Sequence, residues 1–180
     1  MKQAAFAIAM MTSLAATSCK HEAPAPPPDP EAWRGEAAKL MPFLPPMLGP
    51  CSSTASAETS HTPRDQGGSD YEARRTYDCT GRSMQLSLHA GNVTAYTTEL
   101  DGRHSNFGSD SKTTYKDVML GGGRGIHMAS TGNGRLDLVL PERIVVTAHL
   151  EHPSPPDELL PIVNNLDFKG LSKIAPQQVP

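Results

Sequence analysis

Apolar and polar residues alternate along most of the chain after residue 70. The pattern is clearest in residues 84–88, 136–140 and 144–150. A period of two places successive side chains on opposite faces of a strand, so each segment is expected to bury one face. Between segments, tight connections such as Asn133-Gly134 favour hairpins. The pattern therefore predicts an antiparallel sheet of about six strands.

Both ends of this region carry helix signals instead. Residues 31–40 have apolar side chains at spacings of three and four, and prolines follow them. Near the other end, Ser154 and Pro155 are typical of a helix start, and a leucine-rich stretch follows. Pro161 either kinks that helix or moves its start to about residue 157. We therefore expect one α+β domain over residues 31–180, with the sheet packed against N- and C-terminal helices.

Three further stretches have simple expectations. Residues 93–100 are rich in β-branched side chains and predict a strand. Residues 52–69 are small, polar and turn-forming, which favours a loop. Residues 101–113 are also polar and are expected to form the most mobile loop of the domain.

The N-terminus has the features of an export signal. One basic residue, Lys2, precedes an apolar stretch over residues 4–11, and small residues lead up to Cys19. The apolar segment is too short to span a bilayer as a mature helix. Residues 1–18 are therefore predicted to be a cleaved signal peptide.

Residues 14–19, Leu-Ala-Ala-Thr-Ser-Cys, resemble the lipobox of bacterial lipoproteins, with Ala16 where leucine is commonest. The resemblance implies cleavage before Cys19 and acyl chains on its sulfur and new amino group. It also implies outer-membrane localisation, facing the periplasm or the cell surface, because Lys20 replaces the aspartate that marks inner-membrane retention. The alternative is an ordinary secreted protein with a chance cysteine at this position.

The assignment of Cys19 to lipidation leaves two other cysteines. With Cys19 lipidated, Cys51 and Cys79 form an even pair in a compartment where disulfides persist. We expect them to bond to each other. A metal pair is the competing interpretation, but their spacing is not that of a zinc motif.

Composition limits the partners. Residues 19–30 comprise the lipidated cysteine and a proline-rich stretch that favours an extended tether. The net charge is -3, and the basic residues form no stripe of the kind that nucleic acid requires. The implied membrane contact is therefore the N-terminal lipid, and nucleic-acid binding is excluded.

One set of side chains suggests a metal site. His89, His127 and His149 are expected opposite the apolar residues of their strands, and Glu151 shares the face of His149. On neighbouring strands these residues would offer ligands typical of zinc or copper. The alternative is that they are ordinary polar residues at solvated strand positions.

Catalytic motifs are missing from the sequence. It contains no Gly-x-Ser-x-Gly elbow, no His-Glu-x-x-His pair and no Cys-x-x-Cys pair. The glycine run at residues 121–125 leads into an alternating segment and not into the helix that phosphate binding needs. We therefore predict no enzymatic activity and no cofactor.

The expected function is non-catalytic binding or scaffolding in the cell envelope, with an envelope protein as partner. A periplasmic metal- or small-ligand-binding module is the alternative. Contact with a partner is expected through residues 101–113 or through an apolar, proline-broken stretch that could equally pack as core. The apolar residues of that stretch are Met41, Phe43, Leu44, Met47 and Leu48.

Overall fold

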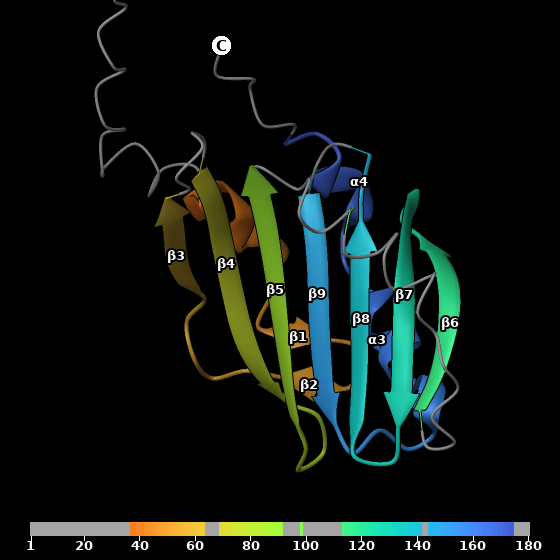
Figure 1. The fold of residues 1–180 in the computed structure, drawn as a ribbon. Coiled ribbons are helices and arrows are strands. Elements are labelled where there is room, and N and C mark those ends of the chain that lie inside the picture. Colours follow the sequence, from red (N-terminus) through yellow and green to blue (C-terminus); the bar gives the residue numbers. More distant parts are fainter. Residues whose placement is uncertain (1–36, 64–68, 92–97, 99–112, 142–143, 175–180) are drawn as a thin grey trace, which may run out of the picture.

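The computed structural model describes residues 37–63, 69–91, 98, 113–141 and 144–174. Most of them belong to one antiparallel sheet that curls into a half-barrel (Figure 1). The strands are β1 (Met47–Leu48), β2 (Cys51–Ser52), β3 (Glu58–Pro63), β4 (Ser69–Asp78), β5 (Ser83–Gly91), β6 (Thr113–Leu120), β7 (Gly123–Ser130), β8 (Asn133–Val139) and β9 (Ile144–Glu151). The helical segments are η1 (Met41–Phe43), η2 (Pro156–Glu158), α3 (Leu159–Val163) and α4 (Phe168–Leu171).

The sheet order is β1-β2-β4-β5-β9-β8-β7-β6, and β3 pairs with β4 beside β2. From the β6 edge, β6, β7, β8 and β9 follow one another as antiparallel neighbours, and β9 then pairs antiparallel with β5. The sheet therefore has β3 and the β1-β2 hairpin at one edge and β6 at the other (Figure 1).

One face of the sheet, here called the core face, carries the alternating apolar residues. Cross-strand pairing places Leu86, Ala148 and Leu136 in one row on this face. The short helices and the turn between α3 and α4 pack against it through five buried residues: Leu159, Ile162, Val163, Leu166 and Leu171. Burying such a side chain stabilises the fold by about 1.5 to 3 kcal/mol, so this contact joins the helices to the sheet.

The predicted α+β class is wrong. In the described part of the chain the sheet has nine strands, not about six, and the helical segments are too short to form a helical layer. The prolines explain the short helices: Pro42 lies in η1, and Pro161 lies within the five residues of α3, where a longer helix would lose a backbone hydrogen bond. The described part of residues 31–40 is helical over residues 37–40.

The predicted loop at residues 52–69 is also wrong over part of its length, because it contains β3. This strand has no apolar alternation; its polar side chains pair with those of β4. Arg74 donates two hydrogen bonds to Glu58 across the pair, at 3.0 and 2.8 Å. The expected strand at 93–100 lies almost wholly outside the described residues, as does the loop at 101–113 up to Thr113, where β6 begins.

Candidate functional site

A disulfide joins Cys51 at the start of β2 to Cys79 directly after β4, as the cysteine count predicted. Both residues are buried in the core cluster. The bond attaches the N-terminal hairpin to the sheet beside the one residue pair that joins β2 and β4, Ser52 and Asp78. The prediction of a Cys51–Cys79 bond is therefore confirmed.

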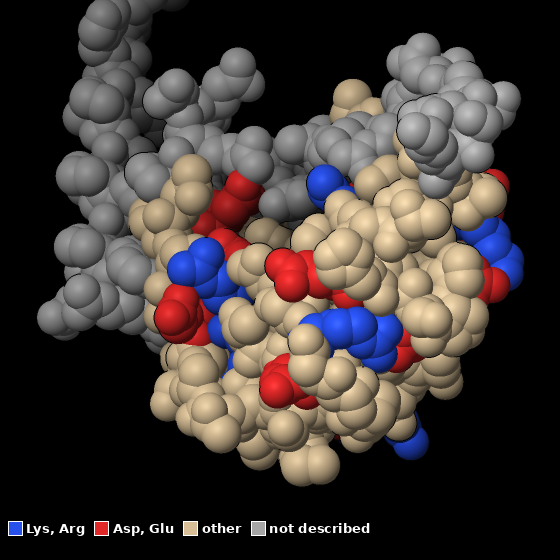
Figure 2. Space-filling view, turned by 90° about the horizontal axis from the view of Figure 1, so that it is seen from below, with Lys and Arg blue, Asp and Glu red and all other residues tan. Residues whose placement is uncertain are grey.

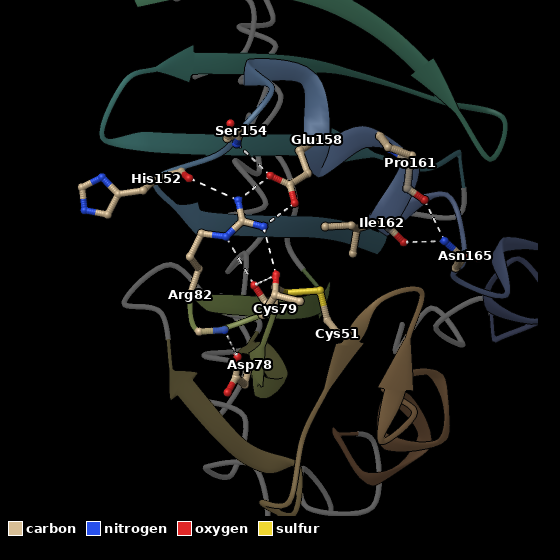
Figure 3. Close-up of a disulfide and its surroundings, with 12 residues drawn as sticks. Cys51, Asp78, Cys79, Arg82, His152, Ser154, Glu158, Pro161, Ile162 and Asn165 are labelled. Carbon is tan, nitrogen blue, oxygen red and sulfur yellow. Dashed lines mark hydrogen bonds and ion pairs between the residues drawn. A yellow bond between two sulfur atoms is a disulfide. The ribbon is translucent and has the colours of Figure 1, made fainter.

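Next to the disulfide, Arg82 connects the β4–β5 turn to the C-terminal segment (Figure 3). Its guanidinium donates to both carboxylate oxygens of Glu158 and also to the carbonyl oxygens of Cys79 and His152, at 3.3 and 3.2 Å. The backbone N–H of Ser154 donates a further hydrogen bond to Glu158, at 2.8 Å. The hydrogen bonds from Arg82 lower the pKa of the Glu158 carboxyl below its usual value.

The face opposite the core face, here called the second face, carries a cluster of polar side chains at its centre. Ser60 and Ser87 both donate to the Glu72 carboxylate, at 2.9 and 2.8 Å, from the two strands that flank β4. Burial alone would raise the pKa of Glu72, but the hydrogen bonds from Ser87 and Ser60 help to lower it overall. The carboxylate is therefore ionised and accepts hydrogen bonds through both oxygens.

His89 lies directly opposite Glu72 in the β4–β5 pairing. Its Nε2 lies 3.2 Å from the Thr147 hydroxyl on β9. Burial lowers the pKa of His89, against the opposing charges of Glu72, Asp70 and Asp137. A neutral imidazole at this position can donate through one nitrogen and accept through the other.

The cluster continues onto β8, where Arg135 donates to Asp137 at 3.1 Å. Asp137 is buried and pairs with Thr147 on β9. Because Thr147 also pairs with Ser87 on β5, the three residues lie in one cross-strand row. Two apolar residues of the second face, Ile126 and Val145, are also buried. This face is therefore not a plain solvated surface at its centre.

The described contacts of this cluster are hydrogen bonds between polar side chains. The Ser87 hydroxyl donates to Glu72, and no hydrogen bond between Ser87 and His89 is present among the described residues. A nucleophile and its base need such a contact. Sequence reasoning missed the cluster because outward strand residues are usually solvated. The polar alternation of residues 72–78, just before the strand at 84–88, was the signal that could have suggested that these side chains face one another.

The structure does not bring the expected metal ligands together. His127 pairs with Lys116 and Leu136, which puts it on the core face, so its predicted face is wrong. His89 and His149 do share the second face, but they pair with different residues, Val145 and Gln85. Glu151 pairs with Asn133 at the far end of β9. The described residues hold no group of three or more His, Cys, Asp or Glu side chains that could bind a metal.

The apolar stretch at residues 41–48 divides between core and surface. Leu44 and Leu48 are buried, and Met41 and Phe43 pack half-buried against the core. Met47 alone of the five is strongly exposed, at 64%.

Other exposed apolar side chains lie on the edge strand β6. Met119 is 75% exposed and Tyr115 is 38% exposed. On the surface seen in Figure 2, acidic and basic side chains lie in small mixed groups and form no large area of one sign.

Among the described residues, no helix is both long and apolar enough to cross a bilayer. Comparison with protein-family models, curated proteins and solved structures finds no match to this chain.

Proposed function

We propose that this protein is a lipid-anchored protein of the bacterial cell envelope with a non-catalytic binding or scaffolding role. The signal peptide ends before Cys19, acyl chains on that cysteine hold the protein in the outer membrane, and residues 20–30 form the tether. The domain that follows faces the periplasm or the cell surface.

The disulfide is the observation that carries this proposal. The chain has three cysteines, and the bond between Cys51 and Cys79 uses two of them. Cys19 is the third, and it follows the lipobox-like residues 14–18. A stable disulfide is typical of an exported protein, which is the same compartment that the signal implies.

Two arrangements support the binding of a partner protein over catalysis and over the alternative, a metal- or small-ligand-binding module. Among the described residues, Ser87 donates its hydrogen bond to Glu72 and has none with His89, so this arrangement does not favour Ser87 as a nucleophile activated by His89. Between the core face and the short helices, buried leucine, isoleucine and valine side chains form one continuous cluster. A partner protein would therefore contact the surface, and the exposed Met119 and Tyr115 on β6 are the contacts we propose, with Met47 at the other edge.

Metabolic labelling tests the anchor. The full-length protein is expressed in a bacterium that processes lipoproteins, together with an alkyne-bearing fatty acid. Wild type is expected to take up label and to fractionate with membranes, whereas Cys19→Ala takes up none. The matched control is the Cys51→Ala/Cys79→Ala double variant, which should keep its label. Label retained by Cys19→Ala contradicts the proposal.

Site-specific crosslinking tests the contact surface. A photoreactive residue replaces Met119 in one variant and Met47 in another, and envelopes are irradiated. One defined adduct from position 119, lost when Tyr115→Lys is added, supports a partner at the β6 edge. If position 119 gives no adduct while position 47 does, the contact lies at the opposite edge and the β6 assignment is wrong.

A further inference from the structure

The three-residue helix η2 contacts two separate parts of the sheet through adjacent carboxylates. Glu158 accepts from Arg82 at the β4–β5 turn, near the disulfide (Figure 3). Asp157 lies 3.6 Å from Nζ of Lys116 on β6 and 3.8 Å from Nδ1 of His127 on β7. Since β5 and β6 are separated by three strands in the sheet, the two side chains of η2 connect parts of the sheet that are not neighbours.

His127 lies beneath this helix on the core face. Its side chain is 1% exposed, and its buried Nε2 has no hydrogen-bond partner in the described part of the chain. A neutral imidazole can leave one nitrogen unpaired as a weak acceptor. An imidazolium carries two N–H donors, and burying a charged, unpaired donor is costly.

The surroundings of His127 do not compensate for a positive charge. The paired residue on β8, Leu136, is apolar, and the paired residue on β6, Lys116, is itself cationic. Within the described residues, Asp157 is the carboxylate that contacts His127, but it is 62% exposed, lies beyond hydrogen-bond distance and is shared with Lys116. An exposed, shared partner of this kind stabilises an ion pair only weakly.

We propose that η2 is an acid-sensitive clasp, which closes over neutral His127 and opens when this imidazole takes up a proton. The Glu158–Arg82 contact holds the other end of the clasp. Opening exposes His127 to water and frees the segment that leads into α3.

The direction of the pH dependence follows from burial. Burial lowers the pKa of His127 from its ordinary value of 6.5, and this outweighs the opposing charge of Asp157. The open state therefore binds the proton more tightly than the closed state. The stability of the clasp is complete above about pH 6.5 and is lost as the pH falls. Glu158, with its lowered pKa, adds a second loss in more acidic solution, below its ordinary value of 4.5.

Hydrogen exchange on the full mature chain tests the clasp. Protection of the amides in α3, corrected for the intrinsic pH dependence of exchange, is compared at pH 7 and pH 5. If the imidazole has its ordinary pKa when the clasp is open, protection can fall by at most roughly 25-fold between pH 7 and pH 5. His127→Leu is expected to flatten this dependence. The control His149→Leu, which removes an exposed histidine of the second face, should leave it unchanged.

Three results would overturn the clasp: constant protection in wild type, protection that rises in acid, or an unchanged pH dependence in His127→Leu. If that variant fails to fold, the wild-type imidazole is titrated by NMR. A midpoint below 6.5 supports the clasp, and one at or above 6.5 rejects it. These outcomes do not depend on acylation of Cys19, so the clasp and the envelope proposal can fail separately.

Discussion

Removing the Cys51–Cys79 disulfide should strongly destabilise the domain. The two cysteines are 28 residues apart in sequence, and closing a loop of that length restricts the unfolded chain. The chain-entropy model gives about 3.5 kcal/mol of stabilisation for this loop at 25 °C. Typical domains are stable by only about 5 to 15 kcal/mol, so the bond is a large share of the total.

Urea denaturation followed by far-UV circular dichroism measures this loss. For a domain of this size the free energy of unfolding falls by about 1.5 to 2 kcal/mol per molar urea. The Cys51→Ala/Cys79→Ala variant should therefore unfold at a urea concentration about 2 M lower than wild type. Wild type treated with a reductant should shift by a similar amount.

The control is Cys19→Ala, which lies outside the disulfide and should unfold with the wild-type midpoint. A shift below about 0.5 M in the double variant would refute the reasoning, because the loop would then contribute little to the unfolded-state entropy. An equal shift in the control would show that Cys19 takes part in the bonding.

Two further predictions concern the packing of the sheet. Gly125→Ala should destabilise the domain by about 1 to 3 kcal/mol, because the new Cβ would collide with the backbone oxygen of Asp137. Gly132→Ala is the control, because its Cβ would meet nothing within 4 Å, and equal urea midpoints for the two variants would contradict this prediction. Tyr77→Phe should lower the free energy of unfolding by about 1 kcal/mol in the same assay, because the Tyr77 hydroxyl donates to the Pro45 carbonyl at 2.9 Å. Burial raises the pKa of Tyr77 to about 12, so wild type should still be the more stable protein at pH 10. Loss of this difference at pH 10 would count against the hydrogen bond.

The strands with apolar alternation were predictable because one buried face imposes a period of two. Met84, Leu86 and Leu88 are buried as expected, and a hairpin joins β7 and β8. Its turn is Thr131-Gly132, however, and Asn133 and Gly134 are already the first two residues of β8. The disulfide followed from cysteine count and compartment. These features depend on local sequence and on the alternation of side chains between the two faces of a strand.

The strand β3 was not predictable in this way. It is polar on both sides and is held by pairing with β4, including the contacts of Glu58 and Ser60. Long-range pairing of this kind leaves no periodic signal in the strand itself. The C-terminal helix is shorter than expected because Pro161 cannot donate the backbone hydrogen bond that a longer helix would need.

The side of the sheet that His127 faces was mispredicted because β7 is buried on both faces. Its apolar Ile126 lies on the second face, and the core face of β7 carries Gly125 and His127. A Cβ at residue 125 would collide with backbone atoms of β8, so this core-face position of β7 is occupied by glycine and not by an apolar side chain. When both faces are buried, apolar character no longer identifies the core side.

The polar cluster around Glu72 shows the same limit. Each residue is an ordinary outward position on its own strand, and the cluster exists only because β3, β4, β5, β8 and β9 come together in a particular register. The sequence could suggest the face of each residue but not its neighbours across five strands.

The mass of the mature chain tests the central claim most directly. Mass spectrometry of the protein extracted from its native envelope should find an N-terminus at Cys19, carrying acyl chains, with Cys51 and Cys79 joined to each other. A bare thiol at Cys19, or a disulfide from Cys19 to either other cysteine, would contradict the envelope assignment.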